Sequence, residues 1–177
     1  MAGEAQIAEL TQKMTSEREK LLSALESLSE GEASQSPKEG EWTAKQQMSH
    51  LCEMETAYRA WVEHALEEDG ANVDGVRGER AGIPIEEAGE HTVSEHTAEM
   101  RRQREETLAL ITSLRPDDFE RRATNALFGS LTVMQWLRSY YRHDRMHVDQ
   151  VSGQEPSYKP KFASGVEPDQ RRGSRTQ

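Results

Sequence analysis

The chain has 177 residues, a formal net charge of −10 at pH 7 and a single cysteine, Cys52. Its hydrophobic fraction of 34% and mean hydropathy of −0.89 are low for a compact domain, so part of the chain is expected to be tail or exposed loop. The acidic balance disfavours nucleic acids and anionic membranes as partners, and one cysteine excludes an internal disulfide and a thiolate-rich metal centre. No signal-peptide pattern or membrane-spanning apolar run is found, so we expect a cytoplasmic protein.

Four segments carry apolar residues at intervals of three, four and seven, the periodicity of an amphipathic helix. The first helix is predicted to end near residues 29–31, before a loop rich in Gly, Ser and Pro. The second, over residues 43–68, opens with a Thr-x-x-Gln pattern typical of a capping box. The third is predicted over residues 92–114, because Pro116 disfavours helix just before it. The fourth, over residues 132–152, opens with the same Thr-x-x-Gln pattern.

The segments between these helices are irregular in composition. Residues 69–91 are rich in glycine and much longer than a typical connector of about 4–6 residues, so we expect them to cross the bundle or to act as a lid. Residues 120–131 are predicted as a loop, and no strand is predicted anywhere. The expected fold is all-α, with a four-helix bundle over residues 1–153. Residues 154–177 are predicted to be a disordered or surface-draped tail.

The most informative stretch of the sequence is RHDRMHVDQV, in which His143 and His147 lie one helical turn apart. Residues four apart share a helix face, so both rings can bind one ion, but a metal site generally needs a third ligand. His50 borders the apolar stripe of the second helix. If the second and fourth helices run antiparallel, His50 lies at the same depth in the bundle as His147. A long crossover after the second helix would produce this antiparallel arrangement. We therefore predict a metal site of His50, His143 and His147.

Three neutral imidazoles suit a divalent transition metal such as Zn, Ni or Fe and leave at least one coordination position open. Asp144 is predicted to point toward the middle of the apolar stripe, where an unpaired carboxylate is costly. Two kinds of partner remain open for it. One is a hydrogen bond to the free ring nitrogen of a ligand histidine, and the other is an ion pair or a hydrogen bond to loop N–H groups.

The remaining histidines, the arginine-rich run and the cysteine are expected to have structural roles. His64 is expected to lie away from the apolar stripe, and neither His91 nor His96 is expected to face the core. The arginine-rich run RRQREE, residues 101–106, is predicted as a solvated helix face. Cys52 is expected to be a buried or partly exposed thiol rather than a nucleophile.

Two stretches taken together resemble a known family. EWTAKQQMSHLCEME, with Trp-Thr leading to His-Leu, and SLTVMQWLRSYYRHDRMHVDQV, with His-Asp-x-x-His-x-x-Gln, are similar to the DinB-like superfamily of damage-inducible and YfiT-related proteins. The resemblance covers most of residues 1–153. It implies an up-down-down-up bundle that is often dimeric, with His50, His143 and His147 at the family's metal-binding positions.

The resemblance also implies an activity. Relatives resemble metal-dependent thiol S-transferases that use low-molecular-weight thiols such as bacillithiol, mycothiol or glutathione. The expected function is therefore a thiol S-transferase with a small-molecule thiol and an electrophilic substrate as partners, in a homodimer. Alternatives are a metal-dependent hydrolase, a non-enzymatic, stress-related metal-binding dimer, and a bundle whose histidines bind no metal.

Overall fold

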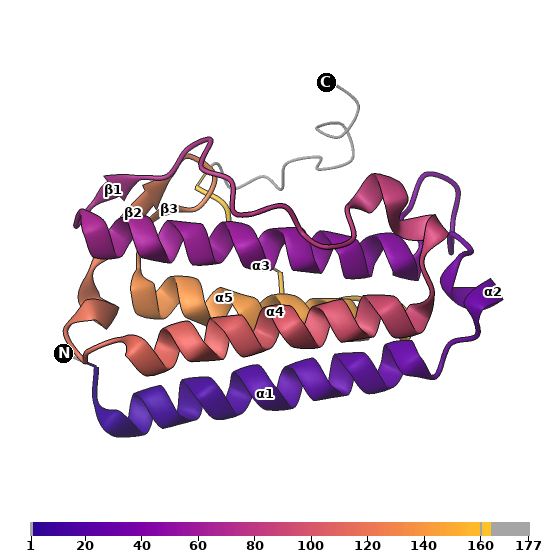
Figure 1. Cartoon of the computed structure of the whole chain (residues 1–177), viewed down its shortest axis with the longest axis horizontal. Helices are drawn as coiled ribbons and strands as arrows, with labels where there is room; N and C mark the ends of the chain where they lie inside the picture. Colours follow the sequence, from indigo (N-terminus) through magenta and orange to yellow (C-terminus); the bar gives the residue numbers. More distant parts are fainter. Residues whose placement is uncertain (1, 160, 164–177) are drawn as a thin grey trace.

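A computed structural model describes residues 2–159 and 161–163, and these residues form a bundle of long helices (Figure 1). The long helices are α1 (Glu4–Glu26), α3 (Ala44–Glu67), α4 (Val93–Ser113) and α5 (Val133–Val151). Helices α1 and α5 run in one direction and α3 and α4 in the other, which confirms the up-down-down-up four-helix bundle (Figure 1). Helices α1 and α3 each contact both α4 and α5. No helix among the described residues is both long and apolar enough to span a bilayer.

Threonine caps set the starts of three long helices. The Thr43 hydroxyl accepts a hydrogen bond from the Gln46 N–H at 3.1 Å, and the Gln46 side chain accepts one from the Thr43 N–H at 3.0 Å. Thr132 and Gln135 form the same reciprocal pair at the start of α5. Both helix starts that the Thr-x-x-Gln patterns predicted are therefore confirmed, because each pair satisfies two otherwise free N–H groups. Thr92 caps α4 in the same way, with a glutamate as its reciprocal partner.

A small three-stranded sheet was not predicted, and the expectation of a plain loop before α5 is wrong. Strands β2 (Arg122–Asn125) and β3 (Gly129–Thr132) form an antiparallel hairpin, and β1 (Ala71–Asn72) pairs with β2 in parallel. Each strand has four residues or fewer, too few to show the alternation of apolar and polar residues by which strands are recognised. A one-turn helix, α2 (Glu30–Ala33), likewise lies in a segment predicted as loop.

The long crossover lies along α3 and α4. Gly78 lies directly against α3, where an added Cβ would stand 2.2 Å from the Thr56 carbonyl, so only glycine fits there. Further along, the Gly82 N–H donates to Glu99 of α4 and the Ile85 N–H donates to Glu53 of α3, both at 3.0 Å. The crossover then ends in a 3₁₀ helix, η1 (Ile85–Glu90). It therefore joins α3 to the parallel helix α4 across one face of the bundle.

The core consists of two apolar clusters at opposite ends of the bundle. One contains most of the aromatic side chains, including Trp61, Trp136 and Tyr140, and the other is rich in leucine and methionine. A charged residue lies between the two clusters on each long helix. These residues are Arg18 on α1, Glu55 on α3, Arg104 on α4 and Asp144 on α5, all at most 4% exposed.

These four residues form a closed ring of ion pairs. Arg18 contacts Glu55 at 2.6 Å and Asp144 at 2.9 Å, and Arg104 contacts the same two carboxylates at 2.8 and 2.9 Å. Burial raises the pKa of Glu55, but the two arginines outweigh it and hold that pKa at about 2. Two positive and two negative charges are thus balanced in the middle of the core. The prediction that residues 101–106 form a solvated face is wrong for Arg104, because its partners come from other helices.

Neutralising one carboxylate of this ring is expected to destabilise the fold. Glu55→Gln keeps the size of the side chain but leaves two buried guanidinium groups facing one carboxylate. We expect the free energy of unfolding to fall by about 3–5 kcal/mol, measured by urea denaturation at neutral pH. Glu9→Gln is the control, since Glu9 forms an exposed ion pair with Lys13, and it should leave the midpoint unchanged. Equal midpoints for both variants would show that the ring does not stabilise the bundle.

Candidate metal centre

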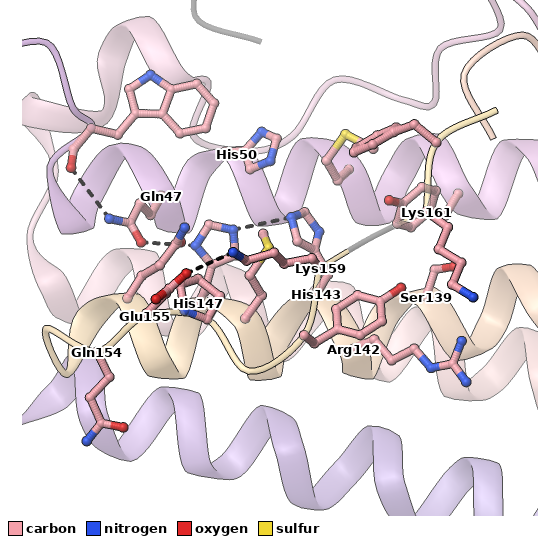
Figure 2. Close-up of a pocket in the computed structure, with 18 of the residues that line it drawn as sticks. Gln47, His50, Ser139, Arg142, His143, His147, Gln154, Glu155, Lys159 and Lys161 are labelled. Carbon is pink, nitrogen blue, oxygen red and sulfur yellow. Dashed lines mark hydrogen bonds and ion pairs between the residues drawn. The ribbon is translucent and has the colours of Figure 1, made fainter. Parts of the chain in front are cut away.

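The structure brings His50 of α3 together with His143 and His147 of α5. One ring nitrogen from each lies within 4.8 Å of the others. The ring centroids are 5.2 Å apart for His50 and His143, and 4.8 Å apart for His143 and His147 (Figure 2). The equal depth inferred for His50 and His147 follows from the antiparallel packing of α3 and α5. The role of the three histidines as metal ligands stays a prediction.

Gln47 determines which nitrogen of His147 faces the centre. The Gln47 amide N–H donates to the Trp42 carbonyl at 3.5 Å, which leaves its oxygen 3.0 Å from Nδ1 of His147. Nδ1 therefore carries the proton and donates it, so the lone pair of His147 is on Nε2. That Nε2 lies 3.2 Å from Nε2 of His143. Sequence reasoning missed Gln47, although its position one turn before His50 on the same helix face was a usable signal.

The three rings are neutral, which is the form of imidazole that binds a metal ion. Burial lowers the pKa of His50 to about 3, with a further contribution from His143. Burial also lowers the pKa of His143 to about 4; nearby Arg18 lowers it further, while Glu55 opposes the shift. The pKa of His147 is likewise lowered by burial and by the other two histidines.

The spacing of the His143 and His147 donors also fits a metal ion. Two nitrogens bound tetrahedrally to one zinc ion lie about 3.3 Å apart. The Nε2 atoms of His143 and His147 lie 3.2 Å apart. The donor set therefore fits a divalent ion of the zinc, nickel or iron type, with room for an exogenous ligand.

The histidines line a cavity of about 1290 Å³ between α3 and α5. Its walls also include the loop before α3, the β2–β3 hairpin and the C-terminal segment. On the α3 side, the Trp42 ring lies 4.7 Å from the His50 ring. No residue of the crossover, 69–91, contributes to the wall, so of the two roles expected for this segment it crosses the bundle and is not a lid over this cavity.

Part of the segment predicted as a disordered or surface-draped tail lies against the cavity. The N–H and the hydroxyl of Ser157 both donate to Asp149 at 2.7 Å, and the Phe162 ring lies 5.4 Å from the Phe128 ring. Residues 154–159 and 161–163 thus fold back over the end of α5. Residues 164–177 of the predicted tail lie outside the described residues, and the division of the chain at residue 153 stays a prediction.

Of the two kinds of partner left open for Asp144, the structure shows the second, an ion pair. Its carboxylate accepts hydrogen bonds from Arg18 at 2.9 and 3.2 Å and from Arg104 at 2.9 Å. In the described part of the chain these two arginines are its hydrogen-bond partners, and neither is a histidine. The orientation of a candidate ligand ring comes from Gln47 instead.

The histidines outside the cluster differ in burial. His64 is exposed on α3, as expected, whereas His96 is only 1% exposed and bonds to the Ala88 carbonyl at 2.9 Å. The expectation that His96 avoids the core is wrong because the 3₁₀ helix η1 covers it. Cys52 is buried, and burial raises the pKa of its thiol, which agrees with a structural role.

The fold and the site together define a class of protein, an up-down-down-up bundle with three histidines from two antiparallel helices at a cavity. The chain belongs to the DinB superfamily, whose family model matches residues 13–151. It is similar to YuaE, an uncharacterized protein of Bacillus subtilis (strain 168), with 28% identity over 138 residues that cover 72% of this chain and 85% of YuaE.

A solved structure shares the fold. It is YfiT from Bacillus subtilis, described as a probable metal-dependent hydrolase with an unusual four-helix bundle topology. The TM-score is 0.71 with 19% sequence identity, and the match covers 86% of this chain and 87% of that one. At this identity the similarity establishes the shared architecture.

Replacing a histidine of the cluster is expected to remove the bound metal. We expect the protein, purified without a His tag, to carry about one divalent ion per chain, and His50→Ala, His143→Ala and His147→Ala to lose most of it. Elemental analysis by mass spectrometry measures the content. His64→Ala is the matched control from α3 and should retain the ion. Full retention of metal in the three cluster variants would refute the site.

Gln47 is expected to tune the affinity for the metal. Gln47→Leu removes the acceptor that orients the His147 ring, so we expect affinity to fall about 10–100-fold. Competition with a chelator of known affinity measures the change. Gln150→Leu is the control, because Gln150 lines the same cavity from an exposed position on α5. Equal affinities for the two variants would contradict the role assigned to Gln47.

Proposed function

We propose that this protein is a metal-dependent enzyme that transfers a low-molecular-weight thiol to an electrophilic small molecule. The observation that carries the proposal is the convergence of three neutral imidazoles at the wall of a large cavity. A structural metal site is normally closed by four protein ligands, whereas a catalytic one keeps a position for substrate. Three ligands beside a cavity support the catalytic interpretation.

The roles of the protein's own residues follow from their contacts. His50, His143 and His147 would hold a divalent transition metal such as Zn, Ni or Fe. Such an ion lowers the pKa of a thiol or a water molecule and makes it a nucleophile at neutral pH. Gln47 keeps Nε2 of His147 directed at the centre, and Trp42 packs beside His50.

The size of the cavity favours two substrates over one. A site for a single small molecule usually measures about 300–1,000 Å³. The cavity of about 1290 Å³ has room for a thiol and an acceptor together. In the transfer, the thiol sulfur forms a bond to an electrophilic carbon, the leaving group departs with its bonding electron pair, and the thiol proton passes to solvent.

A metal-dependent hydrolase is the second candidate. It is supported by the description of YfiT as a probable metal-dependent hydrolase. It is also supported by Glu41 and Glu155, carboxylates on the cavity wall that can accept a proton from water, although Glu155 forms an ion pair with Lys159 at 2.8 Å. A non-enzymatic metal-binding bundle is the third. The homodimer, the cytoplasmic location and the absence of nucleic-acid and membrane partners stay predictions.

Spectroscopy of the cobalt-substituted protein separates these candidates. We expect glutathione, used as the probe thiol, to change the visible spectrum, because a sulfur ligand would enter the open position. S-methylglutathione is the matched control and should leave the spectrum unchanged. No response to glutathione or to other small thiols would reject the transferase. Metal-dependent cleavage of ester or amide substrates would then support the hydrolase. If no such cleavage is found, the result supports the non-enzymatic metal-binding protein.

A further inference from the structure

Arg142 lies on the cavity wall immediately before the candidate ligand His143. Its guanidinium carbon is 5.9 Å from the centre of the Tyr141 ring and 5.8 Å from the centre of the Tyr158 ring. Cation–π contacts with two rings restrict the side chain and so reduce the entropy that it loses on binding a ligand. Tyr158 belongs to the C-terminal segment, so this segment helps to hold Arg142 in place.

The guanidinium of Arg142 has no hydrogen-bond acceptor among the residues that the structure describes. Within residues 2–159 and 161–163, no carboxylate forms an ion pair with it. Arg145, three residues further along the same helix, instead pairs with Glu17 at 2.9 Å. A half-buried arginine without an acidic partner is unusual on a chain with a net charge of −10, and it can bind an oxyanion through two parallel N–H groups.

Lys161 supplies a second positive charge on the wall of the same cavity. It lines the cavity from the C-terminal segment, and Figure 2 shows it on the same side of the cavity as Arg142. It too has no ion-pair partner among the residues that the structure describes. Two cations that line one cavity, neither paired with a carboxylate among the described residues, attract an anion from solution.

Apolar side chains form another part of the cavity wall. Met54 and Tyr58 of α3, Phe128 and Leu131 of the hairpin and Phe162 of the C-terminal segment line it. Side chains of this kind bind the apolar body of a small molecule, while a few charged groups fix its orientation. The cavity therefore combines a histidine centre, an apolar surface and charged groups of both signs, of which Arg142 and Lys161 have no ion-pair partner among the described residues.

We propose that the substrate of this site is a small organic acid with an aromatic or apolar body, and that Arg142 and Lys161 bind its carboxylate. The identification of this ligand as the substrate rests on the proposed function, because the histidine centre would act on its other end. The binding of the carboxylate depends only on Arg142, Lys161 and the apolar wall. These two parts can be tested separately.

The test compares 4-phenylbutyrate with its uncharged amide, 4-phenylbutanamide, by isothermal titration calorimetry on the metal-loaded full-length protein. We expect the acid to bind more tightly than the amide by about 10–100-fold, the usual contribution of a hydrogen-bonded charge. Arg142→Gln and Lys161→Gln should each reduce this preference by weakening the acid and not the amide. Arg145→Gln is the matched control from the same helix and should retain the preference. Circular dichroism verifies that each variant is folded.

The His50→Ala variant distinguishes the two groups to which a carboxylate can bind, which are the bound metal and the cations Arg142 and Lys161. A preference for the acid that persists in His50→Ala and disappears in Arg142→Gln supports the proposal, even if the thiol experiment fails. A preference that disappears in His50→Ala and persists in Arg142→Gln places the carboxylate on the metal and overturns the proposal. Equal binding of acid and amide, or no binding of the acid at millimolar concentration, overturns it as well.

Discussion

Four buried charges, one from each long helix, determine how the helices of this bundle lie against one another. A buried charge is costly unless it is paired, so a helix shifted by one turn would leave Arg18, Glu55, Arg104 or Asp144 without its partners. The apolar clusters on either side tolerate rearrangement more readily, because apolar contacts are not directional. The ring therefore specifies the register of the helices, and the apolar clusters supply most of the favourable burial.

The same ring determines the depth of the histidine centre. Asp144 follows His143 directly, and Glu55 lies little more than one turn beyond His50, so pairing the charges also brings the imidazoles of α3 and α5 to one level. Successive residues of a helix point about 100° apart. Arg142, His143 and Asp144 consequently face three environments: the outer cavity, the histidine centre and the charged ring. One helical turn thus contributes to the cavity wall, to the histidine cluster and to the stability of the bundle.

Helical periodicity, threonine caps and the i, i+4 histidine pair were local patterns, so the long helices and the three-histidine cluster could be predicted from the sequence. Features that depend on partners far away in the chain could not be predicted from the sequence. Whether Arg104 is solvated or buried depends on Glu55 and Asp144, which lie on other helices, and His96 is buried only because η1 packs over it. The strands were too short for a pattern, and the C-terminal segment packs through contacts that its irregular composition does not indicate.

The histidine cluster and part of the cavity wall come from different parts of the chain. The family model matches residues 13–151, a range that contains the charged ring, Gln47 and the three histidines. The residues of the C-terminal segment that line the cavity lie beyond that range: Gly153, Gln154, Glu155, Pro156, Tyr158, Lys159, Lys161 and Phe162. Membership of the superfamily therefore accounts for the centre but not for the whole cavity. Because loops vary more readily than the helices that they follow, the segment after α5 can change while the packing that fixes the histidines is left intact.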